Sequence, residues 1–293
     1  YMTSPTPFSE QTQHDKDSGG NAGRDISKET GSEPGVSGSP SVPNGLTGRL
    51  SYGEKLLARI EGLYASKTVH LAPEPEGGRH GIIGVDGMDM GATQPSPYLK
   101  TAILGDSMAA ACGVENQSEG LMPRIAHGIA QRINRPVLWE TYGRLGATMR
   151  RVRFREFPEV AGTDYDIMYI CAGSNDLMAQ RSTAEWREDL LAVIRQAKER
   201  AKAVIILSPG QLYNSPSLGR ALRKAMLIAS DRQTAESERI CKAQGVTYLN
   251  LTHVEVNADV PEFYAYDHFH PGKQGYQVIA DYVTKHTPLS STI

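Results

Sequence analysis

From residue 98 onward, short apolar runs alternate with longer stretches whose apolar side chains recur every three or four positions. The five apolar runs are LKTAILGD, PVLWETYG, YDIMYICAG, AVIILSPG and VTYLNL. Continuous runs of this length predict strands that are buried on both faces. Because these strands alternate with amphipathic helices, the pattern predicts an α/β fold, a three-layer α/β/α domain around a mostly parallel, five-stranded sheet.

The predicted helices follow the runs in turn. The face made by Leu121, Ile125, Ile129 and Ile133 indicates the first helix, and AEWREDLLAVIRQAKER indicates the second. A long helix is expected over about residues 217–244, and GYQVIADYVTKH predicts a closing helix.

Two segments precede this domain, which we place at residues 98–288. Residues 1–47 consist mainly of Ser, Gly, Pro, Thr and Asn. So few apolar side chains cannot offset the entropy lost on ordering, and we expect a disordered tail. Residues 48–97 combine a helical pattern, YGEKLLARIEGLY, with an arm from residue 71 that has too many Pro and Gly for regular structure. We expect this helix and arm to pack on the main domain.

Charge and composition exclude several classes of protein. The net charge of −2 gives no general attraction to nucleic acid, and no stretch reaches the roughly 18 apolar residues of a membrane span. No apolar leader segment is found near the N-terminus, so the default expectation is a cytoplasmic protein without stable membrane insertion. Cys112, Cys171 and Cys241 lack CxxC spacing, which argues against disulfides and a zinc site. The sequence does not indicate an oligomeric state.

The first apolar run ends in ILGDSMAA, which places Ser107 at the carboxyl end of a strand. Ligands bind at such strand ends in parallel sheets. A serine there has three possible roles: a helix N-cap, part of a phosphate-binding loop, or a nucleophile. The stretch contains neither GxxxxGK[ST] nor GxGxxG, which argues against the phosphate loop. An N-cap explains Ser107 alone, whereas a nucleophile requires a base and oxyanion donors elsewhere in the chain.

A suitable base occurs in YDHFHPGKQGY, where Asp267 lies three residues before His270. This spacing in a tight turn lets the carboxylate reach one ring nitrogen while the other faces outward. His268 is an alternative base, but it directly follows Asp267 and cannot easily fold back onto that carboxylate.

Candidate oxyanion donors follow two other predicted strands. Asn175, in AGSND, offers a side-chain NH₂ group, and Gly146, in TYGRLGAT, allows its backbone N–H to approach a ligand closely. Gly143 is a second candidate in the same loop. Asp176 is better explained as a structural cap than as a catalytic carboxylate.

These motifs resemble those of the SGNH hydrolases, also called GDSL-type esterases and lipases. GDSM, the glycine of RLGAT, GSND and DHFHP occur in the order of the four blocks of that family, over about residues 98–286. The resemblance implies a flavodoxin-like fold. The preceding helix and arm resemble the N-terminal extension of one actinobacterial-type branch. Met108 stands where the family name has leucine.

The resemblance implies a role for each site residue. Ser107 is the expected nucleophile, His270 the general base and Asp267 its orienting partner. The oxyanion hole is expected to comprise the N–H groups of Ser107 and Gly146 with the Asn175 side chain. The implied reaction is hydrolysis of a small-molecule ester with a small or medium acyl group, through an acyl-enzyme and without metal or organic cofactor.

Two alternatives stay open from the sequence. An acyltransferase uses the same machinery to pass the acyl group to a sugar or lipid alcohol. A non-catalytic binding protein retains the fold alone, although the complete motif set argues against it.

Overall fold

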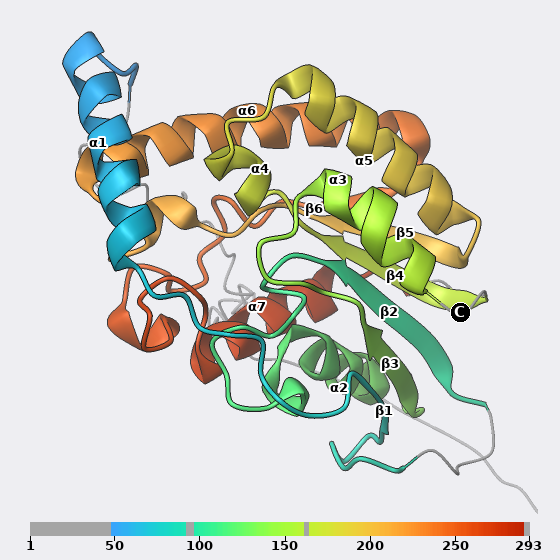
Figure 1. Cartoon of the computed structure of the whole chain (residues 1–293). Helices are drawn as coiled ribbons and strands as arrows, with labels where there is room; N and C mark the ends of the chain where they lie inside the picture. Colours follow the sequence, from blue (N-terminus) through green and yellow to red (C-terminus); the bar gives the residue numbers. More distant parts are fainter. Residues whose placement is uncertain (1–47, 92–96, 161–163, 290–293) are drawn as a thin grey trace, which may run out of the picture. The chain divides into compact units, whose positions relative to one another are not determined.

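The computed structural model describes residues 48–91, 97–160 and 164–289, so the predicted tail of residues 1–47 lies outside the described part. Within it, one sheet has the strand order β1-β3-β2-β4-β5-β6 (Figure 1). The strands are β1 (His80–Ile83), β2 (Leu99–Gly105), β3 (Val137–Thr141), β4 (Tyr165–Cys171), β5 (Ala201–Leu207) and β6 (Thr247–Leu249).

The five predicted strands are confirmed as β2 to β6, and all of them pair in parallel. The sheet nevertheless has six strands in the described residues, because β1 adds an antiparallel edge to β3. β1 lies in the arm for which we expected no regular structure, and that expectation is wrong at these four residues. The short run HGII pairs along an otherwise open edge of the sheet, and this pairing satisfies backbone groups of β3.

The α-helices of the described residues are α1 (Tyr52–Thr68), α2 (Leu121–Ile133), α3 (Met149–Arg151), α4 (Ser174–Met178), α5 (Thr183–Lys198), α6 (Arg220–Gln244) and α7 (Lys273–His286). The five predicted helices are confirmed as α1, α2, α5, α6 and α7, whereas the short helices α3 and α4 were not predicted. Single turns of 3₁₀ helix occur at Gln117–Glu119, Phe157–Glu159, Leu212–Asn214 and Pro261–Phe263, and a π turn occurs at Val152–Glu156. No helix in these described ranges is both long and apolar enough to cross a membrane.

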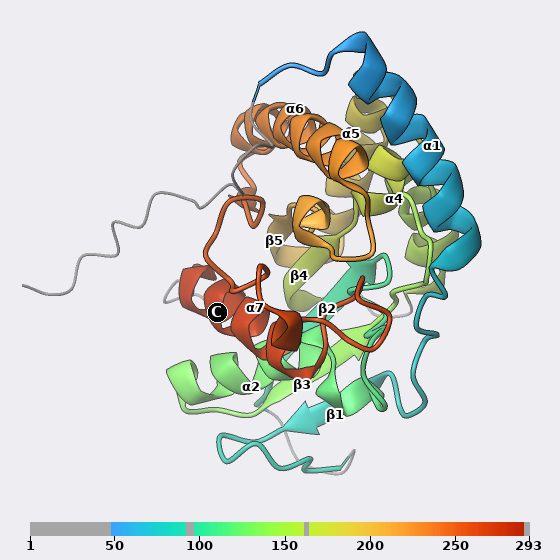
Figure 2. The same cartoon turned by 90° about the vertical axis from the view of Figure 1, so that its left-hand side faces the viewer.

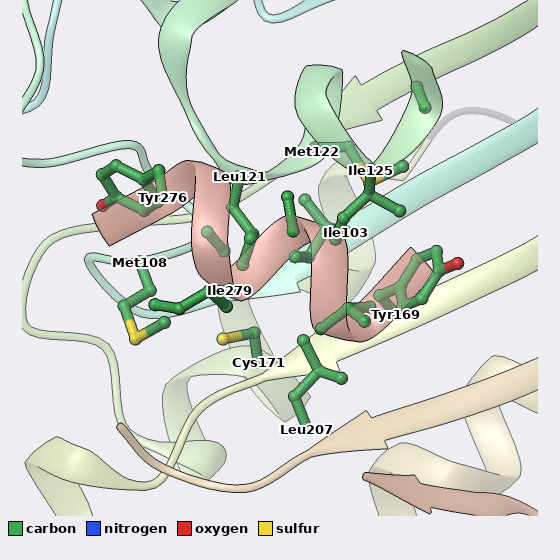
Figure 3. Close-up of a cluster of buried hydrophobic side chains, with 14 of the residues drawn as sticks. Ile103, Met108, Leu121, Met122, Ile125, Tyr169, Cys171, Leu207, Tyr276 and Ile279 are labelled. Carbon is green, nitrogen blue, oxygen red and sulfur yellow. The ribbon is translucent and has the colours of Figure 1, made fainter. Parts of the chain in front are cut away.

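Helices cover both faces of the sheet, as the α/β/α prediction requires. α2 and α7 lie on one face, and α5 and α6 lie on the other (Figures 1 and 2). Figure 3 shows the core under α7, where Tyr276 and Ile279 gather with Leu121 of α2 and with Ile103 and Leu207 of the strands. Neighbouring strand residues such as Ala102 and Leu104 face the opposite core. The strands are therefore buried on both faces, which explains their continuous apolar sequences.

α1 packs beside α6 through polar contacts at two points (Figure 2). The Glu61 carboxylate accepts the Leu222 N–H at 2.6 Å, so α1 caps the N-terminus of α6, and Lys224 pairs with Glu54 at 2.8 Å. The apolar side chains that indicated this helix are largely exposed, for example 53% at Leu56 and 67% at Leu63.

The strand order determines where a site can form. The five parallel strands, counted along the chain, have the order 2-1-3-4-5, which is that of flavodoxin-like folds. In this order, β3 lies next to β2 on one side, and the chain then crosses over to add β4, β5 and β6 on the other side of β2. The crevice at this switch lies beyond the carboxyl ends of β2 and β4.

Candidate active site

β2 and β4 lie side by side at this crevice, and Gly105 pairs with Cys171 at their ends. Gly105 has φ +152°, and a Cβ there would lie 1.8 Å from the Cys171 carbonyl oxygen. Only glycine allows this approach. The following Asp106 N–H donates to the same carbonyl at 2.8 Å, and the chain then turns away from the sheet at Ser107.

Ser107 caps no helix in the described structure. Residues 107–113 form consecutive turns, and α2 begins only at Leu121 with Gly120 as its N-cap. The N-cap explanation of this serine is therefore wrong. Ser107 is buried at the wall of a hollow of about 50 Å³, which Asn175 and His270 also line.

The loop before α7 holds Asp267 and His270 together. The Asp267 Oδ2 atom lies 2.6 Å from His270 Nδ1, and Oδ1 accepts the N–H groups of Phe269 and His270 at 3.0 and 2.9 Å. The other ring nitrogen, His270 Nε2, is buried and has no hydrogen-bond partner among the described residues. The predicted Asp267–His270 pair is thus formed. His270, which carries the unpartnered Nε2, lines the same hollow as Ser107.

The Asp267 carboxylate stays ionised over the whole physiological range. Burial alone would raise its pKa, but the hydrogen bonds from the His270 side chain and from the N–H groups of Ala72, Phe269 and His270 lower the pKa to about 2. The ionised carboxylate favours a proton on His270 Nδ1, which leaves Nε2 as the acceptor.

The three predicted oxyanion donors have unused N–H groups. Within the described residues, neither the Ser107 nor the Gly146 backbone N–H donates to a protein acceptor. Asn175 Nδ2 donates one hydrogen to the Ala147 carbonyl at 2.9 Å, which holds the amide beside the Gly146 loop and leaves its second hydrogen. Gly146 lies outside the lining of the hollow and is exposed, with φ +75°.

The other candidates occupy different environments. A Cβ at Gly143 would lie 2.2 Å from the Ala110 nitrogen, so packing explains this glycine, and its N–H already faces Thr141 Oγ1 at 3.4 Å. His268 is exposed and does not line the hollow. Asp176 is buried and accepts the Met149 N–H at 2.8 Å, which is a structural role.

The N-terminal arm contacts the site in a way that the sequence did not indicate. The Ala72 N–H donates to Asp267 Oδ2 at 2.9 Å. The Glu74 carboxylate accepts the Leu145 N–H at 2.7 Å, and Arg79, paired with Glu74 at 2.5 Å, donates to the Gly143 carbonyl at 2.8 Å. The arm therefore positions both the Asp267 carboxylate and the loop that carries Gly146.

Three buried carboxyl groups lie near Ser107 in addition to Asp267. Asp106 accepts the Met108 N–H at 3.1 Å, and Glu156 accepts the Gly105 N–H at 3.0 Å. Burial raises the pKa of Asp106 to about 7, that of Glu156 to about 8 and that of Asp176 to about 6. Repulsion from Asp176 on Asp106, and from Asp106 on Glu156, contributes to these raised pKa values in the same direction as burial.

These raised pKa values predict that the contribution of the three carboxyl groups to the free energy of unfolding decreases as the pH rises. A carboxyl whose folded pKa exceeds its unfolded value stabilises the fold below about pH 4.5 and loses that contribution as the pH rises through the folded value. Glu156→Gln should therefore leave the free energy of unfolding nearly unchanged at pH 5 and raise it by roughly 1–3 kcal/mol at pH 9. Urea unfolding at both pH values measures this. An equal effect at the two pH values would contradict the assignment.

Acyl transfer through a serine requires a nucleophile, a base held by a carboxylate, and hydrogen-bond donors for the oxyanion. The site has a serine at a strand end, an imidazole bound to a buried carboxylate, and unused N–H groups. Comparison with known proteins agrees with this chemistry. The model of the GDSL-like lipase/acylhydrolase family matches residues 103–278, and the chain belongs to this family. It is a serine ester hydrolase, and a triad with an oxyanion hole is typical of the family.

Solved structures show the same fold at low sequence identity. An α/β hydrolase from the metagenome of Lake Arreo, Spain, is 22% identical with a TM-score of 0.50, over 64% of this chain and 94% of that one. A lipolytic G-D-S-L protein from Veillonella parvula is 16% identical with a TM-score of 0.51, over 64% and 98%. A variant of an acetylxylan esterase from Geobacillus stearothermophilus is 18% identical with a TM-score of 0.50, over 64% and 93%. No curated protein sequence matches the chain.

Proposed function

We propose that this chain hydrolyses a carboxylic ester with a small or medium acyl group, through an acyl-enzyme on Ser107. The observation that carries the proposal is the Asp267–His270 pair, with the unpartnered Nε2 belonging to the same hollow as Ser107. The size of that hollow, about 50 Å³, supports a short acyl group, since it holds only a few water-sized groups. One similar structure is an acetylxylan esterase.

The reaction has two halves. Ser107 Oγ attacks the ester carbonyl carbon while His270 Nε2 takes the hydroxyl proton. The oxyanion accepts hydrogen bonds from the N–H groups of Ser107 and Gly146 and from Asn175. When the tetrahedral intermediate collapses, His270 donates the proton to the departing alcohol. Water then attacks the acyl-enzyme, again with His270 as base, and releases the carboxylic acid and free Ser107.

Within the family, we place the chain in the actinobacterial-type branch on the basis of its N-terminal helix and arm. The contacts of the arm to Asp267 and to the Gly146 loop support a catalytic role for this extension.

Turnover of model esters tests the proposal. The chain should release p-nitrophenolate from p-nitrophenyl acetate and leave p-nitroacetanilide uncleaved, because the proposal is specific to esters. Added 1-butanol reports how the acyl-enzyme divides between water and alcohol. Acetic acid as the main product supports hydrolysis, and butyl acetate as the main product supports the acyltransferase alternative. Absence of turnover on the acetate, butyrate and octanoate esters would refute an ester hydrolase.

The arm provides a further prediction. Glu74→Ala removes the acceptor for the Leu145 N–H and the partner of Arg79, so the Gly146 loop should shift slightly. We expect kcat to fall between about 10-fold and 10²-fold with little change in KM, because small displacements of catalytic groups have effects of this size. Glu76→Ala is the matched control, since that exposed residue contributes its backbone carbonyl to Gln117. Equal kcat values for the two variants would show that the arm has no positioning role.

A further inference from the structure

A second hollow, of about 770 Å³, lies between α1 and α6, and we call it the α1–α6 groove. Its walls are mainly apolar. From α1 and the start of the arm they include Ala58, Gly62, Leu63, Ala65, Val69 and Leu71, and from the opposite side Leu218, Leu222 and Met226. Several of these side chains are exposed, including Leu63 at 67% and Leu71 at 41%. An apolar ligand that covered them would be stabilised by the area it removes from water.

The groove adjoins the catalytic hollow. Met178 and Phe269 line both spaces. Met178 follows Asn175 on α4, and Phe269 directly precedes His270 and packs edge-to-face on its ring at 5.1 Å. Met178 is 41% exposed, so an apolar side chain stands open to solvent where the two spaces meet. An extended molecule with one part at Ser107 and another part in the groove would pass these two side chains.

The chemistry of the triad indicates which part of an ester lies in the groove. His270 must donate a proton to the leaving alcohol, so the alcohol oxygen lies next to the imidazole. The groove reaches Phe269, which packs on the imidazole, whereas the catalytic hollow of about 50 Å³ is lined on its other sides by buried residues such as Leu251 and Ile279. The small hollow suits the acyl group, and the larger groove suits the alcohol.

We propose that the α1–α6 groove binds the alcohol part of the ester and that this part is an extended apolar group, such as an alkyl chain. The substrate class is then a short-chain acyl ester of a large apolar alcohol. This inference rests on the ester hydrolysis proposed above. It also gives α1 a function, because this helix forms one wall of the groove.

Two series of substrates test the assignment of the two ends. In alkyl acetates from ethyl to hexyl acetate, we expect kcat/KM to rise about 4-fold for each added methylene, since each buried methylene contributes about 0.8 kcal/mol. In ethyl esters from acetate to hexanoate, we expect kcat/KM to fall by 10-fold or more, because the acyl hollow is small. A rise with acyl length and no dependence on alcohol length would overturn the proposal.

Gly62 allows the groove to be filled without disturbing the triad. A Cβ at Gly62 meets no atom within 4 Å, and replacing a helical glycine is favourable for helix formation. Gly62→Trp should abolish the gain in kcat/KM from ethyl to hexyl acetate. Gly53→Trp is the matched control, because Gly53 also lies in α1 with open space around its Cβ but outside the groove.

The outcomes separate this inference from the proposed function. If the wild-type chain hydrolyses p-nitrophenyl acetate but gains nothing from longer alcohols, the groove assignment is wrong and ester hydrolysis stands. If Gly62→Trp and Gly53→Trp retain the same dependence on alcohol length, the alcohol lies elsewhere and the assignment is equally wrong. If wild type hydrolyses no ester, the proposed function itself fails.

Discussion

Asp267→Asn is expected to lower kcat for p-nitrophenyl acetate by about 10⁴-fold. Asp267 is fully ionised and accepts the His270 Nδ1 hydrogen at 2.6 Å. An asparagine of the same shape presents an NH₂ group or a neutral oxygen in its place. The NH₂ group favours the tautomer with its proton on Nε2, which cannot accept the serine proton, and the neutral oxygen stabilises the imidazolium poorly.

Two comparisons make this result specific. Asp231→Asn removes the charge from another Asp–His contact, in which His253 Nε2 lies 2.6 Å from Asp231 Oδ1 at the surface, and should leave kcat within about 2-fold. Urea unfolding shows whether the Asp267→Asn chain is folded. A folded Asp267→Asn variant with at least a tenth of wild-type kcat would remove Asp267 from the triad.

Asn175→Ala is expected to lower kcat by about 10²–10³-fold with a much smaller change in KM. The second Nδ2 hydrogen of Asn175 has no acceptor until an oxyanion develops, so its contribution appears mainly in the transition state. The variant also loses the contact to the Ala147 carbonyl, which holds the amide beside Gly146. Steady-state kinetics on p-nitrophenyl acetate separate kcat from KM.

Asn214→Ala is the matched control for this substitution. Asn214 is also a buried asparagine, bonded to Gln211 at 2.8 Å, but it does not line the catalytic hollow. It should change stability and leave kcat within a few-fold of wild type. Near-wild-type turnover of Asn175→Ala would exclude this side chain from the oxyanion hole.

The parallel strands could be predicted because burial on both faces leaves a strong signal. A strand such as YDIMYIC has one charged residue, Asp166, and near-continuous apolar runs that alternate with helices are typical of parallel sheets covered on both faces. β1 could not be predicted in the same way. It has four residues, lies at an edge, and begins HG, so neither its length nor its alternation separates it from a loop.

The contact between Asp267 and His270 was predictable because it is local. Three residues in a tight turn bring the two side chains together, and the structure shows that contact at 2.6 Å. The support from the arm was not predictable. The Ala72 N–H that reaches Asp267 is a backbone group 195 residues away in the chain, and a backbone donor has no sequence signature. Glu74, in a Pro-rich stretch, resembles any exposed acidic residue until the fold brings it to Leu145.

The central claim is that Ser107 is an activated nucleophile, and covalent labelling tests it most directly. A fluorophosphonate should add once to the wild-type chain, and peptide mass spectrometry should locate the adduct at Ser107. Labelling should vanish in Ser107→Ala and slow strongly in Asp267→Asn, because the base then lacks its orienting partner. An adduct on another residue, or ester hydrolysis that persists in Ser107→Ala, would contradict the account.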